Sequence, residues 1–243
     1  MISSAPFSSE RVGTAQRTCV YCLQNEEIKE EQILLRGEHL YLCAPRGQLV
    51  EGYLAISPYL CTGSLSQLPA EYFEELARLK SIAAAFYDQA YGVTRSIMYE
   101  QGRGGGGARI DRAGGFPLHA HLCCLPAAVD LHGILAAKYV ELAVRGLEEL
   151  PTAVNNRPYV YVEGPDSAGA YRPAVYVAKS SDGDADVEQE RLKPALAAAL
   201  NMPERGDWRA YPGDMELSCV IERFAAFKRD LYWKENSNVR AAG

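Results

Sequence analysis

The sequence predicts an α+β fold, and three observations support this prediction. The chain has 243 residues, of which 48% are hydrophobic and 23% charged, a balance typical of a globular protein that can bury a core. Apolar residues recur at helical spacing between Pro69 and Tyr91, so this segment is expected to be a long amphipathic helix. Other segments are short, rich in β-forming residues and bounded by turn residues, which is typical of strands.

The N-terminal half is expected to contain three strands around that helix. Residues Ile33 to Cys43 and Tyr53 to Ile56 predict two adjacent strands with turn residues between them. Pro69 is acceptable in the first turn of the helix, and Gly92 is suited to end it. Val93 to Tyr99 predicts the third strand.

The C-terminal half mixes helices and strands. Leu131 to Leu147 predicts a second long helix, for which Asp130 is a suitable N-cap. Asp186 to Leu200 also has a helical composition and opens with a pattern similar to a capping box, but Pro194 requires that helix to start or kink there. The remaining elements are two paired strands and a final amphipathic helix, at Tyr159 to Val162, Ala174 to Ala178 and Met215 to Tyr232.

Two of the four histidines lie two residues apart in the apolar run from His119 to Pro126. Because side chains alternate along a strand, His119, His121 and Cys123 are expected to share one face, with neighbours ~7 Å apart. Three reactive side chains would then meet on one surface. The opposite face is expected to be buried, and its members are Leu118, Ala120, Leu122 and Cys124.

Charge and cysteine content argue against several classes of protein. The net charge is −6 with a pI of about 5.4, and no long block of Lys and Arg is present, so binding of nucleic-acid polymers is not expected. No apolar run is long enough for a signal sequence or a membrane anchor. Seven cysteines, an odd number, predict reduced thiols or metal ligands in a cytoplasmic protein rather than a disulfide framework.

A glycine-rich segment precedes the histidine pair. It runs from Gln101 to Gly115 and carries three arginines, Arg103, Arg109 and Arg112. Consecutive glycine N–H groups and arginine side chains can hold a phosphate, but such a run is equally typical of a plain surface loop. No Gly-Lys-Ser/Thr follows, so the segment is not a Walker motif. Both alternatives stay open.

Four motifs in this order resemble the histidine-triad (HIT) superfamily of nucleotide hydrolases and nucleotidyltransferases. They are a Cys-x-x-Cys pair, a strand ending in proline, a Glu-containing element and the His-x-His strand, at Cys19–Cys22, Gly52–Pro58, Tyr99–Gly102 and His119–Pro126. The resemblance implies a HIT-like antiparallel sheet with two long helices in residues 18–150. It also implies a C-terminal α/β extension, residues 151–243, packed on the HIT-like domain. Residues 1–17 are polar and rich in serine and are expected to form a mobile tail. Members of this superfamily commonly dimerise, which implies a homodimer unless the extension covers that surface.

The same resemblance implies a structural zinc ion. Relatives with an N-terminal Cys-x-x-Cys often bind zinc through both cysteines, a later histidine and the first histidine of the strand motif. Carried over to this sequence, the ligands are Cys19, Cys22, Cys61 and His119, with Cys61 in the place of the later histidine. Zinc accepts a Cys3His set as readily as Cys2His2, so this replacement is chemically coherent.

The second histidine of the strand, His121, corresponds to the nucleophile of this superfamily. The resemblance implies that it attacks the α-phosphorus of a nucleotide or nucleotide conjugate and forms a nucleotidyl-histidine, which water or another acceptor resolves. The expected function is therefore a HIT-type nucleotide hydrolase or nucleotidyltransferase, with a specialised biosynthetic role as one option. Without the motif, His121 would more simply be a hydrogen-bonded strand histidine.

Cys123 stands where the superfamily has a third histidine or a glutamine. A neutral thiol is a weak donor, so transition-state stabilisation should suffer. Three alternatives follow, namely slow turnover, a leaving group that needs little help, or positive charge supplied by Arg103, Arg109 or Arg112. The rival hypothesis is a non-catalytic nucleotide-binding or scaffold protein with the same fold and zinc. Cys123 favours it, as does Tyr53 at a position where a histidine is expected.

Overall fold

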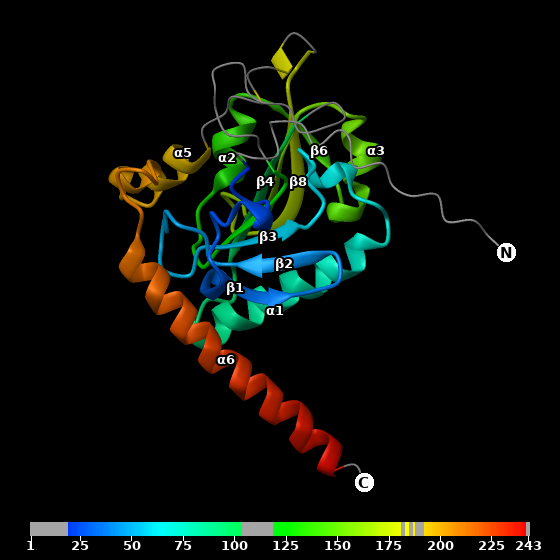
Figure 1. The fold of residues 1–243 in the computed structure, drawn as a ribbon. Helices are drawn as coiled ribbons and strands as arrows, with labels where there is room; N and C mark the ends of the chain where they lie inside the picture. The colour runs from blue at the N-terminus through cyan, green and yellow to red at the C-terminus, as the bar shows by residue number, and fades with distance from the viewer. Residues whose placement is uncertain (1–18, 104–118, 181–182, 185–186, 188–191, 242–243) are drawn as a thin grey trace, which may run out of the picture.

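Eight strands in the described part of the chain form one antiparallel sheet. The computed structural model describes residues 19–103, 119–180, 183–184, 187 and 192–241, and for 232–241 only the helix backbone (Figure 1). The strand order is β1-β2-β3-β5-β4-β7-β8-β6. The strands are β1 (Ile33–Arg36), β2 (Leu40–Cys43), β3 (Leu54–Pro58), β4 (Ile97–Gly102), β5 (Leu122–Leu125), β6 (Val140–Ala143), β7 (Tyr159–Pro165) and β8 (Tyr171–Val177).

Five α-helices and several single turns of 3-10 helix surround this sheet in the described residues. The 3-10 turns matter for the site because two of them, η2 (Leu23–Asn25) and η4 (Leu65–Gln67), follow the cysteines discussed below. None of the described helices is both long enough and apolar enough to cross a membrane. The α-helices are α1 (Tyr72–Tyr91), α2 (Leu131–Ala136), α3 (Leu150–Val154), α5 (Leu192–Ala199) and α6 (Asp214–Ala241).

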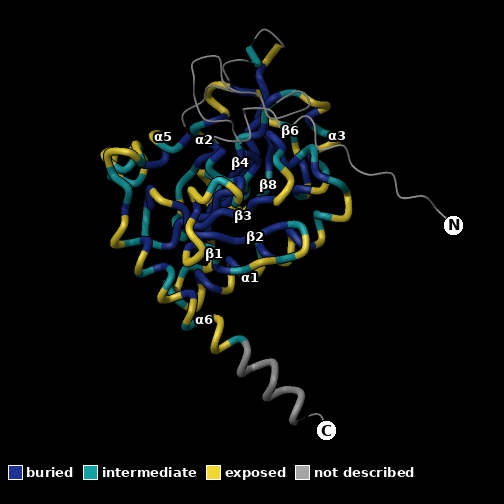
Figure 2. Tube along the Cα trace, viewed as in Figure 1, coloured by how far each residue is buried: buried dark blue, intermediate teal, exposed yellow. Residues whose placement is uncertain are grey.

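The sheet separates two apolar cores. On one face, strand residues such as Leu122 pack with α1 and α6, whose Phe86 and Phe224 rings lie 4.9 Å apart. On the other face, Leu125 packs with Leu131 of α2 and with α5. The buried residues accordingly concentrate along the central strands, whereas exposed residues lie at the periphery (Figure 2). The α-helix α6 packs against α1 and β1 and then projects away from the sheet (Figure 1).

The register across the centre of the sheet places the predicted site residues. Cys123 of β5 pairs with Ala55 of β3 on one side and with Tyr99 of β4 on the other. Ala120, Leu122 and Cys124 belong to the core on the α1 face, whereas Cys123 belongs to the core on the opposite face. The predicted alternation along this segment is confirmed for these residues, although the strand begins only at Leu122. Leu118 lies outside the described residues.

The α+β class and the first long helix are confirmed. Gly92 ends α1 with φ of 65°, and its N–H bonds back to carbonyls of the last turn, as its lack of a side chain allows. The single strand expected from Ile33 to Cys43 is wrong, because this segment is the hairpin of β1 and β2. Gly37 makes the turn by donating to the Leu40 carbonyl at 2.8 Å, and the Glu75 carboxylate of α1 accepts the His39 N–H.

The second long helix expected from Leu131 to Leu147 is also wrong. Asp130 does cap its start, accepting the Gly133 N–H at 2.8 Å, but α2 ends at Ala136. Residues Val140–Ala143 instead form the strand β6 along the free edge of β8. Pairing with an open sheet edge supplies ladder hydrogen bonds that the helical composition of this segment does not outweigh.

The sheet is continuous across the boundary predicted at residue 150. The strands β4 and β7 pair from Met98 with Glu163 to Gly102 with Tyr159, so strands from both predicted regions alternate in one sheet. Of the segment predicted as a helix from 186 to 200, the structure describes Val187 and the α5 residues, with Pro194 near the start of α5. The division into domains stays a prediction.

Candidate metal centre and adjoining pocket

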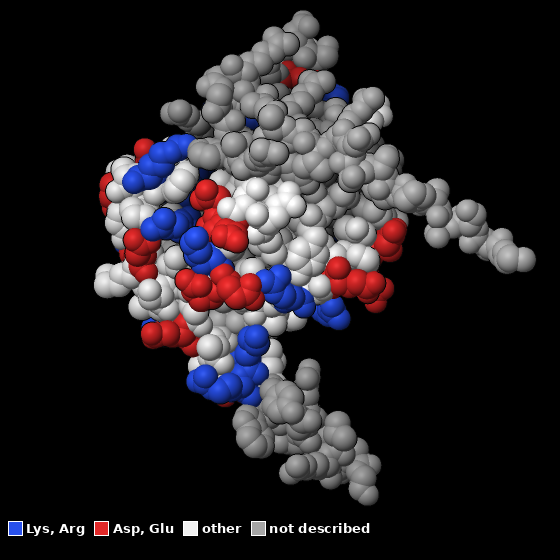
Figure 3. Space-filling view, viewed as in Figure 1, with Lys and Arg blue, Asp and Glu red and all other residues white. Residues whose placement is uncertain are grey.

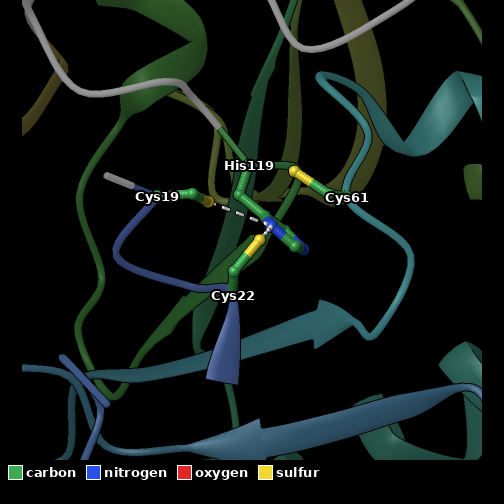
Figure 4. Close-up of side chains that lie close together, drawn as sticks. All are labelled: Cys19, Cys22, Cys61 and His119. Atoms are coloured by element: carbon green, nitrogen blue, oxygen red, sulfur yellow. Dashed lines mark hydrogen bonds between the residues drawn. The ribbon is translucent and has the colours of Figure 1, made fainter. Parts of the chain in front are cut away.

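Four side chains from three separate segments of the sequence converge near the N-terminal end of the described chain. The ligand atoms of Cys19, Cys22, Cys61 and His119 all lie within 4.8 Å of one another (Figure 4). The His119 Nδ1 atom is 3.3 Å from Cys19 Sγ and 3.4 Å from Cys22 Sγ. Tetrahedral zinc with Zn–S of about 2.3 Å and Zn–N of about 2.0 Å requires S···N separations of about 3.5 Å. The spacing therefore suits a metal ion at the centre of the group.

The local backbone explains how these residues meet. Cys19 and Cys22 flank a tight turn in which the Cys22 N–H donates to the Cys19 carbonyl. Cys61 lies in the loop that follows β3, and His119 lies just before β5, which pairs with β3. The Ala120 N–H donates to the Thr62 carbonyl at 2.7 Å, which ties the residue after His119 to the residue after Cys61.

Hydrogen bonds orient the His119 ring toward the sulfur atoms. Its Nε2 lies 2.8 Å from the Pro58 carbonyl, so Nε2 carries the proton and donates, and Nδ1 presents its lone pair to the cysteines. Metal-bound histidines commonly donate their second ring N–H to a backbone carbonyl in this way. The Cys22 and Cys61 thiols hydrogen-bond to the Cys19 sulfur and hold the pKa of Cys19 well below its usual range. The four predicted ligands are thus together and could hold a metal ion, and their chemistry is compatible with zinc.

A pocket of about 470 Å³ adjoins this cluster. His119 and His121 both line it, and so do Val20 and Tyr21, the two residues between the paired cysteines. The Tyr21 ring stacks on the His121 ring with centroids 4.2 Å apart, and His121 Nδ1 donates to the His119 carbonyl at 2.7 Å. The remaining lining residues are Glu27, Ile28, Gln32, Pro45, Arg46, Tyr53, Arg103, Lys193 and Trp208.

Cys123 lies buried beneath the wall that His121 and Tyr53 form. Its sulfur is 3.0 Å from the Tyr53 hydroxyl, and Tyr99, its partner in β4, is also a hydrogen-bond neighbour. Burial raises the pKa of the thiol, but the His121 imidazole together with the Tyr53 and Tyr99 hydroxyls outweighs burial and lowers it. Burial likewise lowers the pKa of His121, yet the Cys123 sulfur and the His119 carbonyl raise it overall. The two residues therefore form an interacting pair.

Three cations line the pocket, and the structure gives each a different environment. Arg46 is paired with Asp214 at 3.2 Å. Arg103, a predicted anion-binding residue, has a buried Nε with no hydrogen-bond partner among the described residues. Lys193 lies with its Nζ 5.2 Å from the centre of the Tyr53 ring. The other two predicted cations, Arg109 and Arg112, and the glycine run lie outside the described residues.

Lys193 and Trp208 are pocket residues that the sequence did not reveal. Both are far from the histidine pair in the chain and reach the pocket only because the C-terminal segment packs beside the loop between β2 and β3, where the Gly47 N–H donates to the Pro212 carbonyl. No local pattern singles out Lys193, a lone lysine in an alanine-rich helix. On the face seen in Figure 3, basic and acidic side chains alternate around α5 and the start of α6 and form no patch of a single sign.

Gly47 allows the C-terminal segment to approach the pocket, and its replacement by alanine should be destabilising. Its φ is 74°, and an added Cβ would lie 2.3 Å from Trp208 Cβ and 2.6 Å from Lys193 Nζ. We expect Gly47→Ala to lower the free energy of unfolding in urea by about 1–3 kcal/mol more than Gly92→Ala. Gly92 is the matched control, because it has a similar φ of 65° and no neighbour within 4 Å of an added Cβ. An equal decrease in the free energy of unfolding in the two variants would show that Trp208 does not crowd a Cβ added at Gly47.

Comparison with known proteins corrects the predicted family. A family model described as "Protein similar to CwfJ C-terminal" matches residues 8–104, which is less than half of the chain. No HIT family model matches, so the assignment to that superfamily is wrong. The function expected from it, a HIT-type nucleotide hydrolase or nucleotidyltransferase, is therefore wrong as well. No curated protein matches the chain.

The cause of the error is the brevity of the motifs on which the assignment rested. A His-x-His pair in an apolar strand places two imidazoles on one face in any protein, whatever its chemistry. The matched region contains Cys19, Cys22 and Cys61 and ends before His119 and His121. Cys123 stands where the superfamily has a third histidine or a glutamine, and Tyr53 stands where it has a histidine; both departures argued against the assignment.

Proposed function

We propose that this chain binds a structural zinc ion at Cys19, Cys22, Cys61 and His119, and that the metal shapes the adjoining pocket for a small organic anion. The observation that carries the proposal is the place of Tyr21, which lies between two of the ligands and stacks on His121 at 4.2 Å. Four protein ligands leave zinc no open position, which favours a structural role. The ion would hold one wall of the pocket in place.

The pocket itself supports the second half of the proposal. Its volume of about 470 Å³ is typical of a small-molecule site, and its walls combine aromatic rings with a few cations and histidines. Arg103 and Lys193 face it without a carboxylate partner among the described residues, whereas Glu27 on the rim is exposed. A small anion fits this arrangement better than a neutral or cationic molecule.

Chemistry at His121 and Cys123 stays a prediction. A nucleotide is one member of the class of small organic anions, and its binding also stays a prediction. With Nδ1 of His121 donating to the His119 carbonyl, the tautomer leaves Nε2 as an acceptor. The interaction of this imidazole with the Cys123 thiol supports a role for the pair in holding or transferring a proton.

Zinc content tests the metal half of the proposal. Protein purified without added metal should contain one zinc ion per chain by plasma mass spectrometry, and Cys19→Ser and Cys61→Ser should lose most of it. Cys219→Ser is the matched control, because Cys219 lies on α6 away from the cluster and should leave the zinc content unchanged. Zinc that persists in both cluster variants, or is absent from the wild type, would contradict the proposal.

Calorimetric titration tests the ligand half. The zinc-loaded protein should bind at least one of three planar anions, adenosine monophosphate, 1-naphthyl phosphate and 1-naphthoate, more tightly than the neutral compounds adenosine and 1-naphthol. Failure of all three anions to bind at millimolar concentration would reject an anion pocket. Binding of the monophosphate in particular would support the predicted nucleotide ligand.

A further inference from the structure

Lys193 occupies an unusual position for a cation. It is in the first turn of the described part of α5, is partly buried and lines the pocket. In the described part of the chain, no carboxylate lies within ion-pair distance of its Nζ. Its neighbours are the Tyr53 ring, 5.2 Å away, and the backbone of Gly47, where an added Cβ would lie 2.6 Å from Nζ.

A partly buried cation with no carboxylate partner among the described residues is unfavourable for the folded chain. Burial lowers the pKa of Lys193 to about 8, while the nearby Cys123 sulfur and the Asp207 carboxylate oppose this shift. Removing an ammonium from water costs several kcal/mol when no partner compensates it. The ring of Tyr53 offsets only part of this penalty, because a cation–π contact contributes about 1–2 kcal/mol. A bound anion would supply the missing partner.

Arg103 provides a second donor from a different element. It follows β4 directly, and its own N–H donates to the Gly63 carbonyl at 3.2 Å, which fixes its backbone beside the Cys61 loop. Its Nε is buried and has no acceptor within the described ranges. Arg46, the third cation, is already paired with Asp214, so Arg103 and Lys193 are the two pocket cations that have no carboxylate partner in the described ranges.

The aromatic walls indicate what the anionic group is attached to. Tyr21 and Trp208 come from opposite ends of the described chain and line the same pocket as the two cations. Tyr21 is held parallel to His121, with an interplanar angle of 18°, and so presents a fixed flat surface. Planar ligand groups gain from packing on such surfaces.

We propose that Lys193 and Arg103 bind the phosphate or carboxylate group of a planar organic anion, whose ring packs against Tyr21 and Trp208. This inference rests on the proposed anion pocket and names its two ligand-binding cations. It assigns a binding role to α5, which lies outside the residues of the family match.

The test compares lysine variants by calorimetric titration of the full-length, zinc-loaded chain. The probes are 1-naphthyl phosphate, 1-naphthoate and neutral 1-naphthol. Lys193→Met should weaken binding of the tighter anion by about 10- to 100-fold, because a charge-assisted hydrogen bond is lost, and should leave the weak binding of 1-naphthol unchanged. Lys193→Arg should stay within about 5-fold of the wild type, since the charge and donors remain. Arg103→Met should weaken the same anion.

Two controls separate ligand binding from a merely structural role. Lys179→Met removes an exposed lysine outside the pocket and should change neither binding nor zinc content. In the absence of ligand, Lys193→Met should be at least as stable as the wild type in urea, because it removes a partly buried charge that no described carboxylate pairs with. A structural role for Lys193 would instead lower stability and weaken binding of the anions and of 1-naphthol alike.

The outcomes also distinguish this inference from the proposed function. If the wild type binds an anion and Lys193→Met binds it equally well, the inference is overturned while the anion pocket stands. Absence of anion binding by the wild type overturns both. The two anions identify the group that is recognised, since preference for the naphthyl phosphate indicates a phosphate ester and preference for the naphthoate a carboxylate.

Discussion

Removal of zinc by a chelator is expected to release the N-terminal segment from the sheet. Metal binding at structural zinc sites contributes about 10–16 kcal/mol of apparent folding free energy in small metal-folded peptides, so this is the largest effect that we predict. Here the loss should be local, because α1 and α6 pack on the sheet through apolar residues far from the cluster. Hydrogen exchange measured by mass spectrometry should show faster exchange in residues 19–32 and around Cys61, with α1 unchanged.

Metal add-back and a cysteine variant are the controls for this experiment. Restoring zinc should restore protection in the same segments, and Cys219→Ser should behave as the wild type in both states. Stacking of Tyr21 on His121 depends on the turn between Cys19 and Cys22, so tyrosine fluorescence should change in parallel. Uniform loss of protection over the whole sheet would show that the metal supports the entire fold rather than one wall of the pocket. No change on metal removal would argue against a structural zinc ion.

The second large effect concerns Glu100, whose carboxylate is buried beneath the loop that carries Cys61. Oε1 accepts the Leu65 N–H at 2.6 Å, and Oε2 accepts the Tyr159 hydroxyl at 2.5 Å. Burial raises the pKa of Glu100 from 4.5 to about 7, although the Tyr159 and Leu65 hydrogen bonds lower it. A raised pKa contributes stability that is fully present below the unfolded value of 4.5 and is lost as pH rises through about 7. The loss is ~3 kcal/mol, since one pKa unit corresponds to about 1.4 kcal/mol.

Glu100→Gln should remove this pH dependence. The amide oxygen can still accept the Leu65 N–H, and the amide nitrogen can donate to Tyr159, which then donates to Ser64 Oγ 3.0 Å away. We expect the difference in unfolding free energy between the wild type and this variant to change by ~3 kcal/mol between pH 4.5 and pH 8. Urea denaturation across this range measures it, and titration of the metal cluster cancels because both proteins carry the cluster.

Glu216→Gln is the control with the opposite sign. Burial raises the pKa of Glu216, but hydrogen bonds from Tyr211 and Arg205 outweigh burial and lower it. The stability that Glu216 contributes should therefore be present above its unfolded pKa and be lost as pH falls, whereas that of Glu100 is lost as pH rises. If both variants change the pH dependence of the unfolding free energy in the same direction, burial does not control the pKa of Glu100.

Local patterns predicted the parts of this protein that local physics controls. The helix α1 follows from apolar residues at helical spacing and from Gly92, whose conformation the helix end requires. The alternation around Cys123 follows from strand geometry. The four candidate metal ligands were carried over from the resemblance, and zinc chemistry made Cys61 acceptable among them. The family assignment failed, since short motifs of this kind recur without common ancestry or function.

Tertiary structure decided the features that depend on partners far away in the chain. Residues Val140–Ala143 form β6 because the edge of β8 is free to pair with them. The sequence of this segment does not indicate that such an edge is nearby. Lys193 became a pocket cation because α5 packs beside Tyr53, and Glu100 became a buried acid because Tyr159 and Leu65 cover it. The sequence by itself determined the class of fold and the first long helix, and it contained the residue types that can bind a metal. The tertiary structure decided which charged side chains are desolvated, because the burial of a side chain depends on every element that packs around it.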